Sequence, residues 1–314
     1  MLHVTNGDSV VASFREGQIE GAYLPWRDVL HDGPVPRSPS LEALSDVRAR
    51  VIAGPGGAYP EVRRAFAERD RALAGFRSHD ETVLWFEHDL YDQLQLLQIL
   101  NWFSRQDLDG AHISLIQIDR HPEVARFVGL GQLDGRQLRE LLPLRKPVTP
   151  RQFGLGRDAW EAYCAPDPRK LLVFAARMSD ALPFLASALT RGLEEYPSTR
   201  DGLSRTERQL LEAGASGARR RREYYEASSA REACPWGDRS VFERLDALAH
   251  GPEPALDRIG DDEFVPTTRG AQLLAGSDDW WRGGGHDVWI GGVHLEHQPR
   301  WRWDSARRTL IADA

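Results

Sequence analysis

The sequence predicts an α/β protein with three parts: a Rossmann-like, mostly parallel sheet with helices on both faces, a helical extension, and a C-terminal winged-helix-like α+β module. Strand-forming and helix-forming segments alternate through the first part. Two continuous apolar runs, Thr82–Phe86 and Ile113–Ile118, are typical of strands buried on both faces of a sheet. After residue 201, helices flank a short hairpin pattern, which is the order of a winged helix.

The N-terminal α/β domain is predicted over residues 1–133. A helix over Leu90–Phe103 joins the two apolar runs, and this strand–helix–strand order predicts parallel pairing with right-handed crossovers. The other predicted elements of this domain are strands at Leu2–Thr5 and Ala22–Trp26, a helix through about Glu16, and helices near Leu41–Ile52 and Glu61–Gly75.

Residues 134–200 are predicted to form the helical extension and a linker. Repeated helix-start signals, two of them with proline at the first helical position, predict N-caps at Asp134, Thr149, Asp167 and Asp180. The segment 197–202 is typical of a linker because proline, serine and glycine gather in it.

Residues 201–314 are predicted to form the winged-helix-like module. Ser204 and Glu207 form a capping box before its first helix, and Thr267 or Thr268 caps its last one. The tail is predicted to hold strands at Val288–Glu296, Trp301–Trp303 and Thr309–Ile311. Five of the ten tryptophans lie in this tail, which favours a small core over a platform for stacking bases.

Composition limits the partners. The net charge of −7 argues against broad nonspecific binding to nucleic acid. Arg219–Arg222 is a basic run, but residues 201–314 hold 16 arginines, no lysine and 20 acidic residues, so DNA is a disfavoured partner. No apolar stretch is long enough to span a membrane, and the N-terminus has no signal-peptide pattern. Two isolated cysteines fit a reducing compartment, and we expect a cytoplasmic protein.

Polar side chains concentrate where the third predicted strand ends. Glu87, His88 and Asp89 follow the strand directly, and Asp92 and Gln93 come one helical turn later. In an open parallel sheet, ligands bind outside the carboxyl ends of the strands. Glu87 and His88 are therefore candidate catalytic groups, and Asp92 and Gln93 are candidate ligand-binding groups. The alternative is helix capping by Asp89 and Asp92, which leaves Glu87 and His88 unexplained.

The turns after the first two predicted strands carry further candidates. If the sheet is parallel, they face the same edge, where Arg27 suits a phosphate or carboxylate and His31 with Asp32 suits a base and its orienting carboxylate. The alternative is a pair of structural turns, with Asp8 or Ser9 capping a helix. The candidate ligand-binding residues of these turns are Asn6, Asp8, Ser9, Arg27 and Asp32, and His31 is a third candidate catalytic group.

Three stretches resemble a bacterial family named domain of unknown function 1835: Leu2–Val10, Leu24–Val35 and Leu84–Leu97. The segment Tyr196–Leu211 resembles the helical continuation found in such proteins, and together these stretches cover about the first two-thirds of the chain. The resemblance implies an α/β domain with a helical extension. It assigns no activity and no catalytic residue.

Three functions stay open at this point. The best supported is binding or hydrolysis of a small phosphate-bearing or nucleotide-type molecule, assisted by a divalent metal with Asp8, Glu87 and Asp89 as its ligands. The second is a regulatory protein whose winged helix binds DNA or another protein. The third is an adaptor in which the polar cluster is a network of caps and ion pairs.

Overall fold

The computed structural model describes residues 1–282 and 286–313. Its contacts divide the chain into two compact units. The first unit comprises residues 1–190 and 289–294, and the second comprises 191–288 and 295–314. The predicted helical extension over 134–200 therefore lies mostly in the first unit, together with the α/β domain. No helix in the described ranges is long and apolar enough to cross a membrane.

A five-stranded sheet with the order β2-β1-β3-β4-β5 organises the first unit. Strands β1 to β4 are parallel, as predicted, and the short β5 joins the edge antiparallel. The strands are β1 (Leu2–Thr5), β2 (Ala22–Pro25), β3 (Glu81–Phe86), β4 (His112–Gln117) and β5 (Lys146–Pro147).

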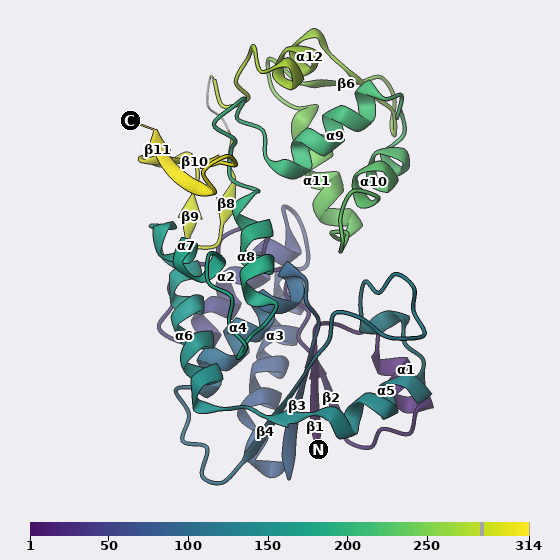
Figure 1. Ribbon diagram of the computed structural model, residues 1–314, viewed down its shortest axis with the longest axis vertical. Helices are drawn as coiled ribbons and strands as arrows, with labels where there is room; N and C mark the ends of the chain where they lie inside the picture. Colours follow the sequence, from purple (N-terminus) through teal and green to yellow (C-terminus); the bar gives the residue numbers. More distant parts are fainter. Residues whose placement is uncertain (283–285, 314) are drawn as a thin grey trace. The chain divides into compact units, whose positions relative to one another are not determined.

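Helices cover both faces of this sheet, with α1 and α5 on one face and α3, α4 and α6 on the other (Figure 1). Successive side chains of β3 point to opposite faces of the sheet, because side chains alternate along a strand. Val83 and Trp85 belong to the core cluster that holds Phe14 of α1 and Leu138 of α5. The helices of this unit are α1 (Val11–Glu16), α2 (Leu41–Ala53), α3 (Tyr59–Ala74), α4 (Leu90–Phe103), α5 (Gly135–Leu141), α6 (Pro150–Tyr163), α7 (Arg169–Ala175) and α8 (Leu185–Leu193), the last of which runs into the second unit.

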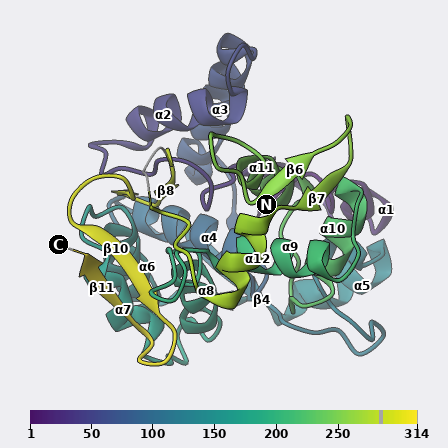
Figure 2. The same cartoon turned by 90° about the horizontal axis from the view of Figure 1, so that it is seen from above.

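The second unit has the element order of a winged helix, with three helices, a hairpin and a further helix; Figure 2 shows the hairpin beside these helices. Arg220, just before α10, forms an isolated antiparallel bridge with Glu263 beside this two-stranded hairpin. The elements are α9 (Arg205–Ala215), α10 (Arg221–Ser229), α11 (Asp238–Leu248), β6 (Leu256–Arg258), β7 (Phe264–Pro266), α12 (Thr268–Ala275), β10 (Arg300–Asp304) and β11 (Thr309–Asp313).

Three local predictions are wrong. The strand predicted over Val288–Glu296 is interrupted: β8 (Trp289–Ile290) and β9 (Val293–His294) pair antiparallel around Gly291, whose φ of 58° turns the chain. Asp180 caps no helix, because it lies in an ion pair with Arg151 at 2.9 Å and α8 begins at Leu185. Asp167 is not an N-cap either, because the N-cap of α7 is Pro168; the Asp167 carboxylate accepts from the backbone N–H of Arg169 at 3.0 Å. Asp134, Thr149 and Ser204 each form a capping box, and Thr267 caps α12.

Candidate functional site

The strand order creates a topological switch point between β1 and β3. From β1 the chain passes through α1 to β2 on one side, whereas β3 lies on the other side of β1 and continues into α4. Neighbouring strands whose connections leave in opposite directions open a crevice outside their carboxyl ends, where open α/β sheets bind ligands. The turn that begins at Asn6 and the segment Glu87–Asp89 both lie at this edge.

Hydrogen bonds bring the two strand ends together. Asn6 Nδ2 donates to Asp92 Oδ2 at 2.7 Å, and the Tyr91 hydroxyl donates to the backbone oxygen of Asn6 at 3.0 Å. Asp92 Oδ1 accepts from the backbone N–H of Glu87 at 2.7 Å. Asp92 therefore ties β1, β3 and the first turn of α4 into one constellation.

Three carboxylates gather there. One oxygen each from Glu87, Asp89 and Asp92 lies within 4.8 Å of the others. Glu87 and Asp92 are buried, and within the described residues no lysine or arginine forms an ion pair with any of the three. Oxygen atoms at this spacing suit a hard divalent cation such as Mg²⁺ or Mn²⁺. The sequence predicts Asp8, Glu87 and Asp89 as the metal ligands. In the structure Asp92 takes the place of Asp8 in this group, and Asp8 forms an ion pair with Arg27 instead.

Burial and mutual repulsion change the acidity of this trio. Burial, reinforced by the charge of Asp89, raises the pKa of Glu87 to about 8. Burial likewise raises the pKa of Asp89 and, together with the charges of Glu87 and Asp89, that of Asp92. Without a cation the cluster therefore retains protons near neutral pH, and a bound cation would displace them.

The segment Gly129–Gly131, which no pattern in the sequence marks, closes over Glu87. The backbone N–H of Leu130 donates to Glu87 Oε1, and a Cβ atom placed on Gly129 would lie 2.5 Å from Glu87 Oε2. A Cβ on Gly131 would lie 3.0 Å from Ser9 Oγ. The segment approaches Glu87 and Ser9 this closely because Gly129 and Gly131 have no Cβ atom. Its local pattern gave no signal, since the contact is made by backbone atoms far away in sequence.

The segment after β2 places Arg27 at the same edge. Its backbone N–H donates to the backbone oxygen of Asn6 at 3.2 Å, and its guanidinium forms two hydrogen bonds with Asp8, of 2.6 and 2.5 Å. Arg27 has a φ of 55°, which is uncommon for a residue with a side chain and is often found at functional sites. The pair is more than half exposed, so an incoming anion can compete for the guanidinium.

Asp28, a neighbour of these candidates, is structural. It is fully buried and accepts from Arg48 Nε at 2.9 Å. The same guanidinium donates to the backbone oxygens of Val29, Asp32 and Pro34, so one arginine of α2 holds the whole segment after β2. The sequence analysis missed Arg48, because nothing in the local pattern of α2 marks it as buried.

The two candidate histidines pack against different aromatic rings. His31 is buried, with Nε2 3.6 Å from Asp32 Oδ2, and its ring meets the edge of Tyr91 at 6.0 Å. His88 stacks on Phe127 with 6.2 Å between ring centres. Gln93 donates from Nε2 to the backbone oxygen of Glu87 at 2.6 Å and holds the end of β3.

Helix capping explains part of this arrangement. Asp89 is the N-cap of α4 and accepts from the backbone N–H of Asp92 at 2.9 Å. Helix capping does not explain Glu87, because the N-cap of α4 is Asp89. It does not explain Asp8 or Ser9 either, because the N-cap of α1 is Val10.

The basic run of the second unit does not form a purely cationic surface. The arginine run is matched by acids: Arg221 pairs with Asp246 at 2.6 Å and Arg222 with Glu226 at 2.7 Å. Arg220 lies 3.8 Å from Glu263. Four of the tail tryptophans are buried, namely Trp280, Trp281, Trp301 and Trp303, and they are not placed as a platform for stacking bases.

No model of a known protein family matches the chain, and none of the curated proteins matches it. The resemblance to the domain of unknown function 1835 therefore stays a prediction.

Proposed function

We propose that the first unit binds a divalent cation through Glu87, Asp89 and Asp92 and, beside it, a small molecule that carries phosphate, with nucleotides as the class to test first. The proposal rests on three carboxylates that gather within 4.8 Å at the switch point and pair with no lysine or arginine of the described residues. Buried carboxylates without a cationic partner are costly unless protons or a metal neutralise them.

Arg27 would supply the positive charge for the phosphate group. It lies on the turn after β2, beside Asn6, and its exposed pairing with Asp8 is the kind that an anion displaces at little cost. A planar guanidinium binds phosphate through two parallel hydrogen bonds.

Hydrolysis is the reaction class that suits these groups. A bound cation lowers the pKa of a coordinated water and polarises the phosphoryl oxygen, while His31 or His88 would accept the proton. The burial of the carboxylates and the loop over Glu87 would keep other water away from the site.

The test is calorimetric titration of Mn²⁺ and Mg²⁺ into the full chain at pH 8, with and without nucleotides. We expect binding in the wild-type protein and its loss in Glu87→Gln, Asp89→Asn and Asp92→Asn. Asp8→Asn is the matched control, because its carboxylate lies outside the trio, and it should retain the metal. If the wild-type protein takes up neither ion, or if the three variants bind as it does, the proposal is wrong.

A further inference from the structure

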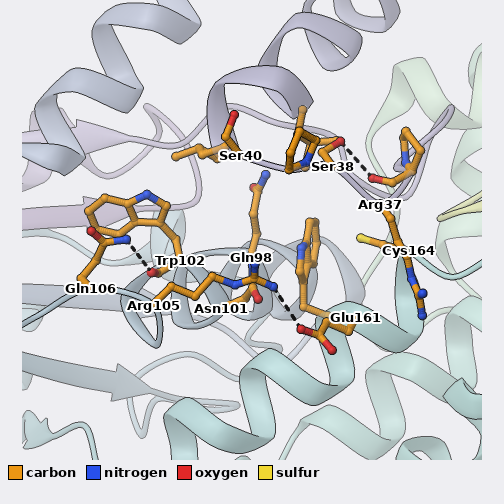
Figure 3. Close-up of a pocket in the computed structure, with 15 residues that line it drawn as sticks. Arg37, Ser38, Ser40, Gln98, Asn101, Trp102, Arg105, Gln106, Glu161 and Cys164 are labelled. Carbon is orange, nitrogen blue, oxygen red and sulfur yellow. Dashed lines mark hydrogen bonds and ion pairs between the residues drawn. The ribbon is translucent and has the colours of Figure 1, made fainter.

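A cavity lies in the first unit, away from the switch point. It has a volume of about 570 Å³, within the range of small-molecule sites. Its walls come from the segment 36–40 with the start of α2, the last turn of α4 with the residues that follow it, and the end of α6 (Figure 3). Gln98 lies six residues after Asp92 on α4, so about 9 Å of helix separates it from the carboxylate cluster.

Gln98 presents an unused donor at this cavity. Its side chain is buried, and Oε1 accepts from Trp26 Nε1 at 2.7 Å. An indole nitrogen only donates, which fixes the orientation of the amide and leaves Nε2 as the other group. Nε2 is buried and has no hydrogen-bond partner in the described part of the chain. Figure 3 shows this side chain rising from α4 toward the segment that holds Ser38 and Ser40.

Asn101, one turn later on the same helix, presents an unused acceptor. Its Oδ1 is buried and has no hydrogen-bond partner among the described residues. Each buried polar atom left without a partner costs about 1–3 kcal/mol, and native proteins contain few of them. Two such atoms on the wall of one cavity therefore point to a molecule that satisfies both.

The rest of the lining is aromatic and cationic. Trp102 and Trp160 supply indole surface, which favours a planar ring. Arg37 is exposed and forms no ion pair with any described carboxylate, whereas Arg105 pairs with Glu161 at 3.0 Å. The N-terminal end of α2 also lines the cavity and carries partial positive charge. Both features favour an anion at the rim.

We propose that this cavity binds a planar heterocycle that carries a carbonyl group and an anionic substituent. The carbonyl oxygen accepts from Gln98 Nε2, and a ring N–H donates to Asn101 Oδ1. The ring lies against the indoles, and the anion lies near Arg37. The cavity and the carboxylate cluster have no residue in common.

The test is calorimetric titration of the full chain in EDTA with uridine 5′-phosphate, and with uridine and ribose 5-phosphate as partial probes. We expect the nucleotide to bind most tightly, uridine more weakly, and ribose 5-phosphate not measurably. Gln98→Met should weaken the nucleotide and uridine by roughly tenfold, because it removes the donor.

Arg37→Ala keeps the test decisive if Gln98→Met does not fold. It should weaken the nucleotide by roughly threefold to fivefold and leave uridine unchanged. Arg64→Ala, an exposed arginine of α3 outside the cavity, is its matched control and should bind as wild type does. EDTA removes divalent cations from these titrations, which separates this site from the proposed metal site. Absence of nucleotide binding, equal binding of ribose 5-phosphate, or an unchanged affinity in Arg37→Ala would overturn the proposal.

Discussion

Asn6 donates a hydrogen bond of 2.7 Å from Nδ2 to Oδ2 of Asp92, although 86 residues separate the two in the chain. Asp92 uses its other oxygen for the backbone N–H of Glu87. One carboxylate thus fixes the ends of two neighbouring strands, and it does so within the trio proposed to hold a cation. A change at Asp92 would therefore disturb both the positions of the two strand ends and the proposed cation site.

Glu87 should make the unliganded protein less stable as pH rises. Its pKa is about 8 in the folded chain, above the ordinary value of 4.5, so the neutral form stabilises the fold fully below pH 4.5. That stabilisation is lost as pH rises toward 8, by at most about 1.4 kcal/mol per pH unit. Glu87→Gln should remove this loss.

Chemical denaturation in EDTA at pH 5, 6, 7 and 8 measures the effect. Glu68→Gln, an exposed change on α3, is the control and should follow the wild-type profile. A Glu87→Gln protein with the same pH profile as the wild type would contradict the raised pKa.

Gly129→Ala should weaken cation binding more than it weakens the fold. The new methyl group would lie 2.5 Å from Glu87 Oε2, so the carboxylate must move away from Asp89 and Asp92. Metal titration and thermal unfolding measure the two effects separately. Gly154→Ala in α6 has open space around it and should leave metal affinity unchanged while it stabilises the helix by up to about 1 kcal/mol. Equal metal affinity in both variants would remove the Gly-Leu-Gly loop from the site.

Arg48→Met should destabilise the first unit by about 3 kcal/mol, because the fully buried Asp28 loses the nearer of its two buried arginine partners. Arg69 remains, but it lies 3.9 Å from Asp28 Oδ2. Arg50→Met, two residues along the same helix, changes an exposed arginine and should cost about 0.5 kcal/mol or less. Urea denaturation compares the two. Adding Asp28→Leu to Arg48→Met should recover part of the loss, and a failure to recover any would show that the backbone contacts of Arg48 outweigh its ion pair.

His3 should make the fold less stable in mild acid. Burial lowers the pKa of its ring from 6.5, and Trp85 Nε1 donates to His3 Nδ1 at 3.1 Å, which requires the neutral ring. The unfolded chain therefore takes up a proton first, and stability falls as pH drops below 6.5. Denaturation at pH 7 and pH 5 should show a smaller difference for His3→Gln than for the wild type. His112→Gln, an exposed change on β4, should keep the wild-type difference.

The second unit should bind duplex DNA weakly or not at all. Acidic side chains lie beside Arg220, Arg221 and Arg222, so phosphate would have to displace them. Fluorescence anisotropy with a labelled duplex at low and moderate salt checks this. Salt-dependent binding that Arg222→Ala weakens would revive the regulatory alternative.

The sequence predicts the central sheet well because the evidence for it is local. The apolar runs of β3 and β4 and the helix between them are contiguous, and parallel pairing follows from their order. It also predicts that the strand-end groups meet, since parallel strands share an edge. It misses β5, where Lys146 and Pro147 pair with β4 without any apolar pattern. It misses the contacts of Arg48 and Leu130 for the same reason: long-range packing leaves no signal in the neighbouring residues.

The β8–β9 hairpin has a consequence for how this protein is made. Trp289–His294 belongs to the first unit, where Gly291 accepts from the backbone N–H of Val35 at 2.7 Å and Gly292 donates to Tyr163 at 3.0 Å. A ribosome delivers the chain from its N-terminus, so the first unit stays incomplete until residues 289–294 have emerged. A fragment that ends near residue 190 would lack the β8–β9 hairpin. A chain in which residues 289–294 are joined directly to residues 1–190 should fold without the second unit.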